Sequence, residues 1–224
     1  MKNNDFDPRT TACFTGHRMI RQSALPQVRE RLAEEVLLAY ISGYRTFLCG
    51  GARGFDTLAA QEVLRFRKTR PDVRIVLVIP CADQSSRWPA NEQKIWQDIR
   101  EQADDVYVLS EAYYTGCMQS RNRLMVDRST LCLCWMTRFE GGTWSTVRYA
   151  LYSGVPVKNL AMQDRPSPVM KENSWNYISI FRSASGNANT ARLSLSRLQR
   201  KKKMHMSVRS SGKQKEDAAR LPSE

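Results

Sequence analysis

The 224-residue sequence lacks every segment that would place it in a membrane. It contains no uninterrupted apolar run of about 18 residues, the length that a membrane-spanning helix requires. Its first residues, MKNNDFDPRT, have no apolar stretch of the kind found in a secretory signal peptide. We therefore expect a cytoplasmic protein that makes no contact with a membrane.

The sequence also lacks the patterns of metal sites and disulfide frameworks. It has two histidines and six scattered cysteines, which are Cys13, Cys49, Cys81, Cys117, Cys132 and Cys134. Several of these cysteines lie in apolar runs, where free cysteine behaves as a small hydrophobic side chain. Cys132 and Cys134 would share one face of a strand, but C-x-C alone is not a zinc-binding spacing. We expect reduced, structural thiols, no metal and no resident cofactor.

Aromatic residues are missing from the C-terminal part of the chain, which is strongly basic. Residues 183–224 contain 10 lysines and arginines against 3 acidic residues, in a chain of net charge +13. Such a composition cannot bury enough apolar surface to fold alone. We expect one domain over residues 1–165, a linker or docking segment over 166–182 and a basic tail of low order over 183–224. A solvated tail is the simpler interpretation, and weak contact with nucleic acid is the alternative.

Short apolar runs alternate with helical periodicity between residues 10 and 160. Strands are expected at residues 11–15, 45–51, 73–80, 105–110, 130–136 and 155–161. Helices are expected at residues 25–39, 55–66, 89–104, 115–129 and 143–153. This alternation predicts an α/β protein with a Rossmann-like open parallel sheet and helices on both faces.

Three glycine-containing turns follow predicted strands: TGHR at 15–18, GGARGFD at 50–56 and EGGTWST at 140–146. In an open α/β sheet, ligands bind beyond the carboxyl ends of the strands. Glycine lets backbone N–H groups approach an anion closely where a helix begins. We therefore expect a site for an anionic small molecule, whose ligand-binding residues would be Thr15, Gly16, His17, Arg18, Gly50, Gly51, Ala52, Arg53, Gly54, Asp56, Arg121, Asn122, Gly141, Gly142 and Thr143.

Several of these side chains have alternative roles. The planar guanidinium of Arg53 matches a phosphate or carboxylate. Asp56 would serve as a helix N-cap, as an acceptor for ribose hydroxyls or as an acid–base group. Arg121 and Asn122 would face the crevice from the start of a helix. His17 would contact the ligand or play a structural role.

The segments FTGHR, LCGGARGFDTLAAQ, RNRLMVDRS and EGGTWSTVRYALYSGVPV together resemble the SLOG superfamily, over about residues 10 to 160. This Rossmann-like group includes the LOG phosphoribohydrolases, the DNA-processing protein DprA and the YpsA and YoqJ proteins, and the YpsA/YoqJ branch is the most similar. The resemblance implies a pocket for a nucleotide or a nucleotide-derived ligand. It thus favours a sensor or regulator that binds such a ligand, and a homo-oligomer is compatible with it.

The resemblance also raises an enzymatic alternative, the LOG-like hydrolysis of a nucleotide glycosidic bond. In LOG enzymes an arginine of a Met-x-x-Arg segment and a glutamate of P-G-G-x-G-T-x-x-E carry that reaction. MQSR at 118–121 places Arg121 in the arginine's position, but Arg148 stands where the glutamate should be. An arginine cannot replace a carboxylate, so the match argues against the LOG reaction. The remaining catalytic candidates are Asp56, Asp127 and Glu140. DprA-like binding of nucleic acid, aided by the basic tail, is a third alternative.

Overall fold

The computed structural model describes residues 7–162, and the expected segments 166–182 and 183–224 lie outside the described residues. The chain forms β1 (Thr11–Gly16), α1 (Leu25–Ile41), β2 (Thr46–Cys49), α2 (Phe55–Arg67), β3 (Arg74–Ile79), α3 (Ala90–Gln102), β4 (Asp105–Val108), α4 (Cys117–Asp127), β5 (Leu131–Trp135), α5 (Gly141–Tyr152) and β6 (Val157–Asn159). Two short 3-10 helices, η1 (Pro8–Thr10) and η2 (Gln22–Ala24), precede β1 and α1. The predicted alternation of strands and helices is therefore confirmed.

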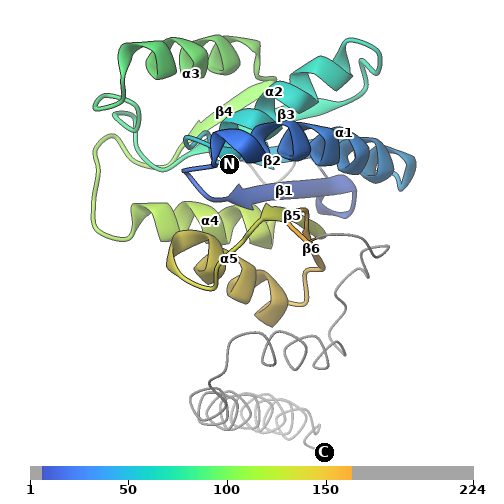
Figure 1. Cartoon of the computed structure of the whole chain (residues 1–224). Helices are drawn as coiled ribbons and strands as arrows, with labels where there is room; N and C mark the ends of the chain where they lie inside the picture. The colour runs from blue at the N-terminus through green and yellow to red at the C-terminus, as the bar shows by residue number, and fades with distance from the viewer. Residues whose placement is uncertain (1–6, 163–224) are drawn as a thin grey trace, which may run out of the picture. The chain divides into compact units, whose positions relative to one another are not determined.

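All the strands of this sheet are parallel, in the order β4-β3-β2-β1-β5-β6. Helices α1, α2 and α3 cover one face, and α4 and α5 cover the other (Figure 1). The chain moves outward from β1 to β4 and then returns to the other side of β1 to form β5. The carboxyl ends of β1 and β5 therefore flank the point at which the strand order reverses, where open α/β sheets have their crevice.

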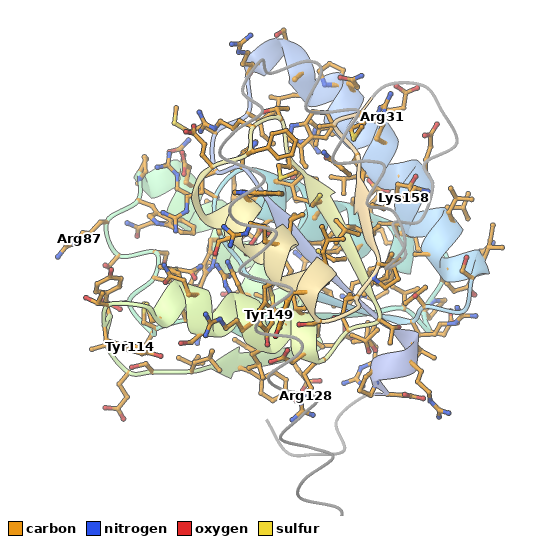
Figure 2. The ribbon with its side chains drawn as sticks, turned by 90° about the horizontal axis from the view of Figure 1, so that it is seen from below. Arg31, Arg87, Tyr114, Arg128, Tyr149 and Lys158 are labelled. Atoms are coloured by element: carbon orange, nitrogen blue, oxygen red, sulfur yellow. The ribbon has the colours of Figure 1, made fainter. Side chains whose placement is uncertain are left out.

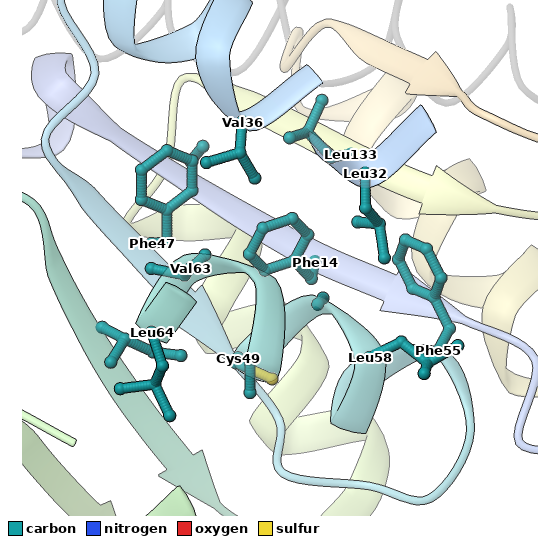
Figure 3. Close-up of a cluster of buried hydrophobic side chains, with 14 of the residues drawn as sticks. Phe14, Leu32, Val36, Phe47, Cys49, Phe55, Leu58, Val63, Leu64 and Leu133 are labelled. Atoms are coloured by element: carbon teal, nitrogen blue, oxygen red, sulfur yellow. The ribbon is translucent and has the colours of Figure 1, made fainter. Parts of the chain in front are cut away.

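Two apolar layers hold this sheet between its helices. The layer under α1, α2 and α3 contains Phe14, Phe47 and Phe55, all fully buried (Figure 3). Phe14 stacks on Phe47 with 5.7 Å between ring centroids. Because buried aromatic rings remove the largest areas from water, these side chains contribute much of the stability of this face.

The layer under α4 and α5 contains Cys132 and Cys134, so the prediction that they share a face is confirmed. All six cysteines of the chain are buried and free, as the sequence predicts. Within residues 7–162, no helix has both the length and the apolar character that crossing a membrane would require.

Most element boundaries differ from the predicted ones by one or two residues, and the differences at α5 and β6 concern the end of the sheet beside β5. Helix α5 begins at Gly141 rather than at residue 143, so the glycine pair forms its first turn instead of preceding it. Strand β6 is limited to Val157–Asn159, shorter than the expected 155–161. Asn159 explains the early end, because its side chain bonds both the N–H and the carbonyl of Met136 beside β5.

Candidate functional site

The loops after β1, β2, β3 and β4 surround a pocket of about 300 Å³ at the carboxyl ends of these strands. We refer to it as the rim pocket. The two longer loops that surround it, after β3 and β4, extend at the left of Figure 1. The lining residues are Arg18, Ala52, Arg53, Cys81, Asp83, Gln84, Ser86, Arg87, Trp88, Tyr113 and Met118. The pocket therefore lies at the edge of the sheet where the sequence predicts a site.

The charged side chains of the rim pocket are mainly basic. Arg18, Arg53 and Arg87 line it together with a single acidic residue, Asp83. Arg53 forms a two-contact ion pair with Glu92 of α3, in which Nη2 lies 2.5 Å from Oε1. Arg18 and Arg87 are exposed, and Figure 2 shows Arg87 extending from the edge of the molecule. The pocket thus presents an excess of guanidinium groups to any ligand that enters it.

Aromatic and amide groups form the rest of the pocket. Trp88 packs edge-to-face against the buried Trp96, with 6.4 Å between ring centroids, and Tyr113 is 61% exposed. Nε2 of Gln84 donates a hydrogen bond of 2.5 Å to the carbonyl of Gly51. This bond ties the loop after β3 to the glycine turn after β2, so the two loops form one wall.

The N–H groups of Gly50, Gly51 and Ala52, at the start of the glycine turn, are directed at groups of the protein itself. The N–H of Ala52 donates to Oδ2 of Asp56 at 3.3 Å, and a backbone hydrogen bond from Gly50 reaches the same carboxyl group. The N–H of Gly51 is directed at the Cys49 thiol. These N–H groups therefore bind groups of the protein itself, whereas the sequence predicts that they receive a ligand's phosphate.

Asp56 is not the N-cap of α2, which corrects one of its expected roles. The N-cap is Gly54, with a φ of 74°, and Asp56 lies inside the first turn of the helix. Its carboxyl group is buried 3.9 Å from Nη1 of Arg121, and the same Nη1 donates a hydrogen bond to the carbonyl of Gly50. Asp56 and Arg121 thus form a buried charged pair directly beneath the turn.

Burial dominates the electrostatics of this pair. It raises the pKa of Asp56, an effect that the nearby Arg121 guanidinium opposes. Burial also lowers the pKa of Arg121, while Asp56 acts in the opposite direction. Arg121 is only 4% exposed and does not line the rim pocket. It therefore does not face the crevice, although the sequence predicts that it does. A buried charge is costly to leave without its partner, which makes both side chains important for the shape of the turn.

Glycine is required at the turn because side chains and loops approach it closely. A Cβ at Gly50 would overlap the Arg121 guanidinium and lie 2.8 Å from Oδ2 of Asp56. A Cβ at Gly54 would overlap the backbone of Arg18 and come within 2.6 Å of the His17 carbonyl oxygen. These glycines thus allow two turns and a buried side chain to pack together.

His17 joins the end of β1 to the start of α2 and to the end of β5. Its Nε2 accepts a hydrogen bond of 2.9 Å from the N–H of Thr137, and its carbonyl accepts one of 3.1 Å from the N–H of Phe55. Its own N–H donates to the carbonyl of Trp135 at 3.3 Å. Burial lowers the pKa of His17, and the hydrogen bond at Nε2 requires the neutral imidazole. His17 therefore serves as a structural link between the turn after β1, the start of α2 and the loop after β5.

The turn after β5 does not line the rim pocket. Gly141 and Gly142 have open space around them, since an added Cβ would meet no heavy atom within 4 Å. Thr143 is buried in the first turn of α5. Nδ2 of Asn122 donates to Oγ1 of Thr146 at 2.7 Å, so Asn122 joins α4 to α5 instead of facing the crevice. The predicted site residues are thus divided between the pocket and its structural support, and Arg18, Ala52 and Arg53 are the ones that line the pocket.

The remaining catalytic candidates lie outside the pocket. Glu140 is exposed and pairs with Arg138, with 3.4 Å between the charged atoms. Oδ1 of Asp127 accepts a hydrogen bond of 2.7 Å from the Tyr149 hydroxyl. Arg148, which is not a catalytic candidate but stands at the position of the LOG glutamate, is also exposed on α5, with its guanidinium carbon 5.9 Å from the centroid of the Trp144 ring.

The segment 81–88, Tyr113 and Met118 are the pocket residues that the glycine pattern did not identify. The segment CADQSSRW has no glycine, so it carries none of the signals used for the other turns. Its position after the apolar strand 73–80 was the available signal, because ligand sites follow the carboxyl ends of parallel strands whatever the loop composition.

Comparisons with known proteins find two similar bacterial sequences and one solved structure with a similar fold. A UPF0398 protein of Halalkalibacterium halodurans is 28% identical over 104 residues, which span 46% of this chain and 55% of that protein. The YoqJ protein of the SPbeta prophage of Bacillus subtilis is 25% identical over 128 residues, or 52% of this chain and 74% of that protein. The solved structure of DNA processing protein A from Helicobacter pylori covers 79% of this chain and 74% of its own, with a TM-score of 0.51 and 19% identity. That last likeness establishes the fold alone.

Residues 15–150 match the family model YpsA, which is described as the YspA SLOG family. The matched range begins at the end of β1 and ends in α5, so it contains the glycine turn, the rim pocket and the Asp56–Arg121 pair. The match covers more than half of the sequence, and the protein therefore belongs to the YpsA family of SLOG proteins.

Proposed function

We propose that the protein binds a nucleotide or nucleotide-derived ligand in the rim pocket and acts as a sensor or regulator. The observation that carries this proposal is the gathering of Arg18, Arg53 and Arg87 with Trp88 and Tyr113 around one pocket at the carboxyl ends of the strands. Guanidinium groups match phosphate oxygens in pairs, and aromatic rings stack on bases. The lining thus offers a separate partner for each half of a nucleotide.

The arrangement supports binding better than hydrolysis of a glycosidic bond. A general acid or base must come within hydrogen-bond reach of the reacting atoms. Arg121 is buried beneath Gly50, Glu140 is paired with Arg138 at the surface, and Asp127 bonds Tyr149. Among the residues that line the rim pocket, Asp83 alone carries a carboxyl group. We therefore expect no product when AMP is incubated with stoichiometric protein in a single-turnover reaction.

Isothermal titration with AMP tests the proposal. Replacing Arg87 by alanine removes a guanidinium that is exposed at the pocket, so the fold should be unaffected. We expect about tenfold weaker binding, which corresponds to the loss of one charge-assisted hydrogen bond. Arg148→Ala is the matched control, because Arg148 is also exposed but lies outside the pocket. Equal affinities of the two variants for AMP would overturn the proposal. An unmodified protein that binds neither AMP nor another nucleotide such as NAD would overturn it as well.

A second candidate function is the binding of single-stranded nucleic acid. DNA processing protein A of Helicobacter pylori, which shares the fold, binds single-stranded DNA. In the present chain, Tyr113 and Tyr114 are 61% and 45% exposed in the loop after β4, beside a pocket with an excess of arginines. Figure 2 shows Arg87 and Tyr114 at the same edge of the molecule. Exposed aromatic rings next to basic groups are the elements with which proteins bind single strands.

Fluorescence anisotropy with a labelled oligothymidine, at two salt concentrations, tests this second candidate. We expect Tyr113→Ala/Tyr114→Ala to weaken binding by about tenfold, since each stacked base contributes on the order of 1 kcal/mol or more. Tyr152→Ala is the control, because Tyr152 is 60% exposed at the far end of α5. Deleting residues 183–224 separates the basic tail from the domain. If affinity falls only on that deletion, the tail binds nucleic acid and the rim does not.

A further inference from the structure

A second groove, of about 280 Å³, lies between α2 and α3, away from the rim pocket. Its lining residues follow a helical i, i+3, i+4, i+7 spacing on both sides: Gln61, Leu64 and Arg65 of α2 with the C-cap residue Lys68, and Ile95, Asp98, Ile99 and Gln102 of α3. Residues at this spacing form one stripe along a helix. Two helices that cover the same face of the sheet therefore present adjoining stripes to solvent.

The floor of this α2–α3 groove is apolar. Leu64 and Ile99 are 8% and 5% exposed, and Ile95 is 37% exposed at its margin. Apolar side chains between two helix ridges are the surface into which the ridges of another helix pack. Contact with a partner would remove this remaining apolar surface from water.

The two walls of the groove carry opposite charges. Arg65 and Lys68 stand on the α2 wall, and Asp98 stands on the α3 wall. Arg65 already pairs with Glu62 of its own helix at 2.6 Å. Over the part of the chain that the structure describes, no ion pair involves Lys68 or Asp98. The groove thus offers one unpaired charge of each sign.

We propose that the α2–α3 groove is a homodimer interface, at which two copies of the chain associate about a two-fold axis. A two-fold interface uses the same patch on both copies, so the α2 wall of one copy meets the α3 wall of the other. Lys68 of each protomer then faces Asp98 of its partner, and two ion pairs form at once. A partner of uniform charge would match one wall and repel the other, which is why a second copy fits this surface best.

The size of this surface sets the expected strength of the dimer. Each helix has 13 residues and is therefore about 20 Å long. Two such helices form a patch at the low end of the range for specific interfaces, which bury about 800 Å² on each partner. We expect a reversible dimer that dissociates on dilution.

Sedimentation velocity of the full-length protein over a wide concentration range tests the proposal, using Lys68→Glu and Asp98→Lys. Each variant places two like-charged contacts in the dimer, and we expect its dissociation constant to rise at least about tenfold. Lys94→Glu is the control, since Lys94 is exposed on α3 but does not line the groove. Circular dichroism confirms that each variant is folded.

Mixing the two variants is the most specific measurement. In a mixed dimer, the new glutamate faces the new lysine and the remaining Asp98 faces the remaining Lys68, so both ion pairs are restored. We expect the equimolar mixture to dimerise about as strongly as the unmodified protein. A monomeric unmodified protein, variants that dimerise normally, or a mixture that stays monomeric would each overturn the proposal. None of these residues lines the rim pocket, so the result is independent of nucleotide binding.

Discussion

At the scale of single residues, Gly50 is a glycine because the Arg121 guanidinium occupies the space where a Cβ would lie. The turn around Gly50 therefore depends on two buried side chains from other parts of the chain as much as on glycine's backbone freedom. Arg121 bonds the Gly50 carbonyl, and Asp56 accepts backbone N–H groups of the same turn. The Asp56–Arg121 pair thus sets the shape of the loop whose next residues, Ala52 and Arg53, line the pocket.

Gly50→Ala should destabilise the protein by about 1 to 3 kcal/mol, because the added methyl group displaces the buried guanidinium. Gly142→Ala is a matched control in the first turn of α5, where no heavy atom lies within 4 Å of the added Cβ. This control should leave stability unchanged or raise it by up to about 1 kcal/mol. Urea denaturation of both variants provides the comparison. Equal stabilities would mean that Arg121 does not occupy the space at Gly50.

His17 should make stability depend on pH. Burial lowers its pKa from the ordinary 6.5, so the folded state favours the neutral ring. The stability that this provides is fully present above pH 6.5 and is lost as the pH falls through the lowered folded-state pKa. His17→Gln retains an acceptor for the Thr137 N–H but does not titrate in this range. We therefore expect the unmodified protein to lose stability relative to His17→Gln on acidification.

Proton NMR titration measures the His17 pKa directly, because the chain has only two histidines. One imidazole resonance should titrate below pH 6.5, disappear in His17→Gln and persist in His205→Gln. A His17 resonance that titrates at or above 6.5 would contradict the hydrogen bond between Nε2 and Thr137.

At the scale of elements, helix α3 is connected to the glycine turn by the ion pair between Glu92 and Arg53. The two side chains are 32% and 44% exposed, so the pair contributes about 0.5 kcal/mol or less to stability. Its larger effect is on the pocket, where Glu92 neutralises one of the three arginines. Helix α3 thus sets how much positive charge the rim pocket presents to a ligand.

Glu92→Gln should strengthen the binding of AMP roughly threefold, because it releases Arg53 and removes a nearby negative charge. Glu101→Gln makes the same change of charge on α3 without touching Arg53, and it should bind AMP as the unmodified protein does. Titration calorimetry compares the two. If Glu92→Gln weakens binding, Arg53 does not receive the phosphate.

The alternation of elements could be predicted from sequence because buried parallel strands are continuous apolar runs. The run at 73–80 became β3 nearly residue for residue, and the position of the crevice followed from the parallel sheet. The burial of the Asp56 carboxyl group beside Arg121 could not be predicted from sequence. Arg121 is 65 positions away and reaches the turn only in the folded chain. The loop at 81–88 could not be identified by glycine because it contains none.

At the scale of the whole molecule, the fold places its two candidate surfaces on different elements. The rim pocket is built from loops at the carboxyl ends of the strands, and the α2–α3 groove lies on the outer faces of two helices. A dimer formed through the groove would therefore leave both pockets free to bind ligand. Helix α3 takes part in both surfaces, through Glu92 at its start and Asp98 in its middle.

The most direct test of ligand binding at the rim pocket is to map AMP binding by backbone amide chemical shifts in isotope-labelled protein. We predict that the largest changes cluster at Arg18, at Ala52 and Arg53, and within residues 81–88, with little change along α1 or β6. Changes that cluster away from the carboxyl ends of β1 to β4, or no changes at saturating AMP, would contradict binding at this pocket.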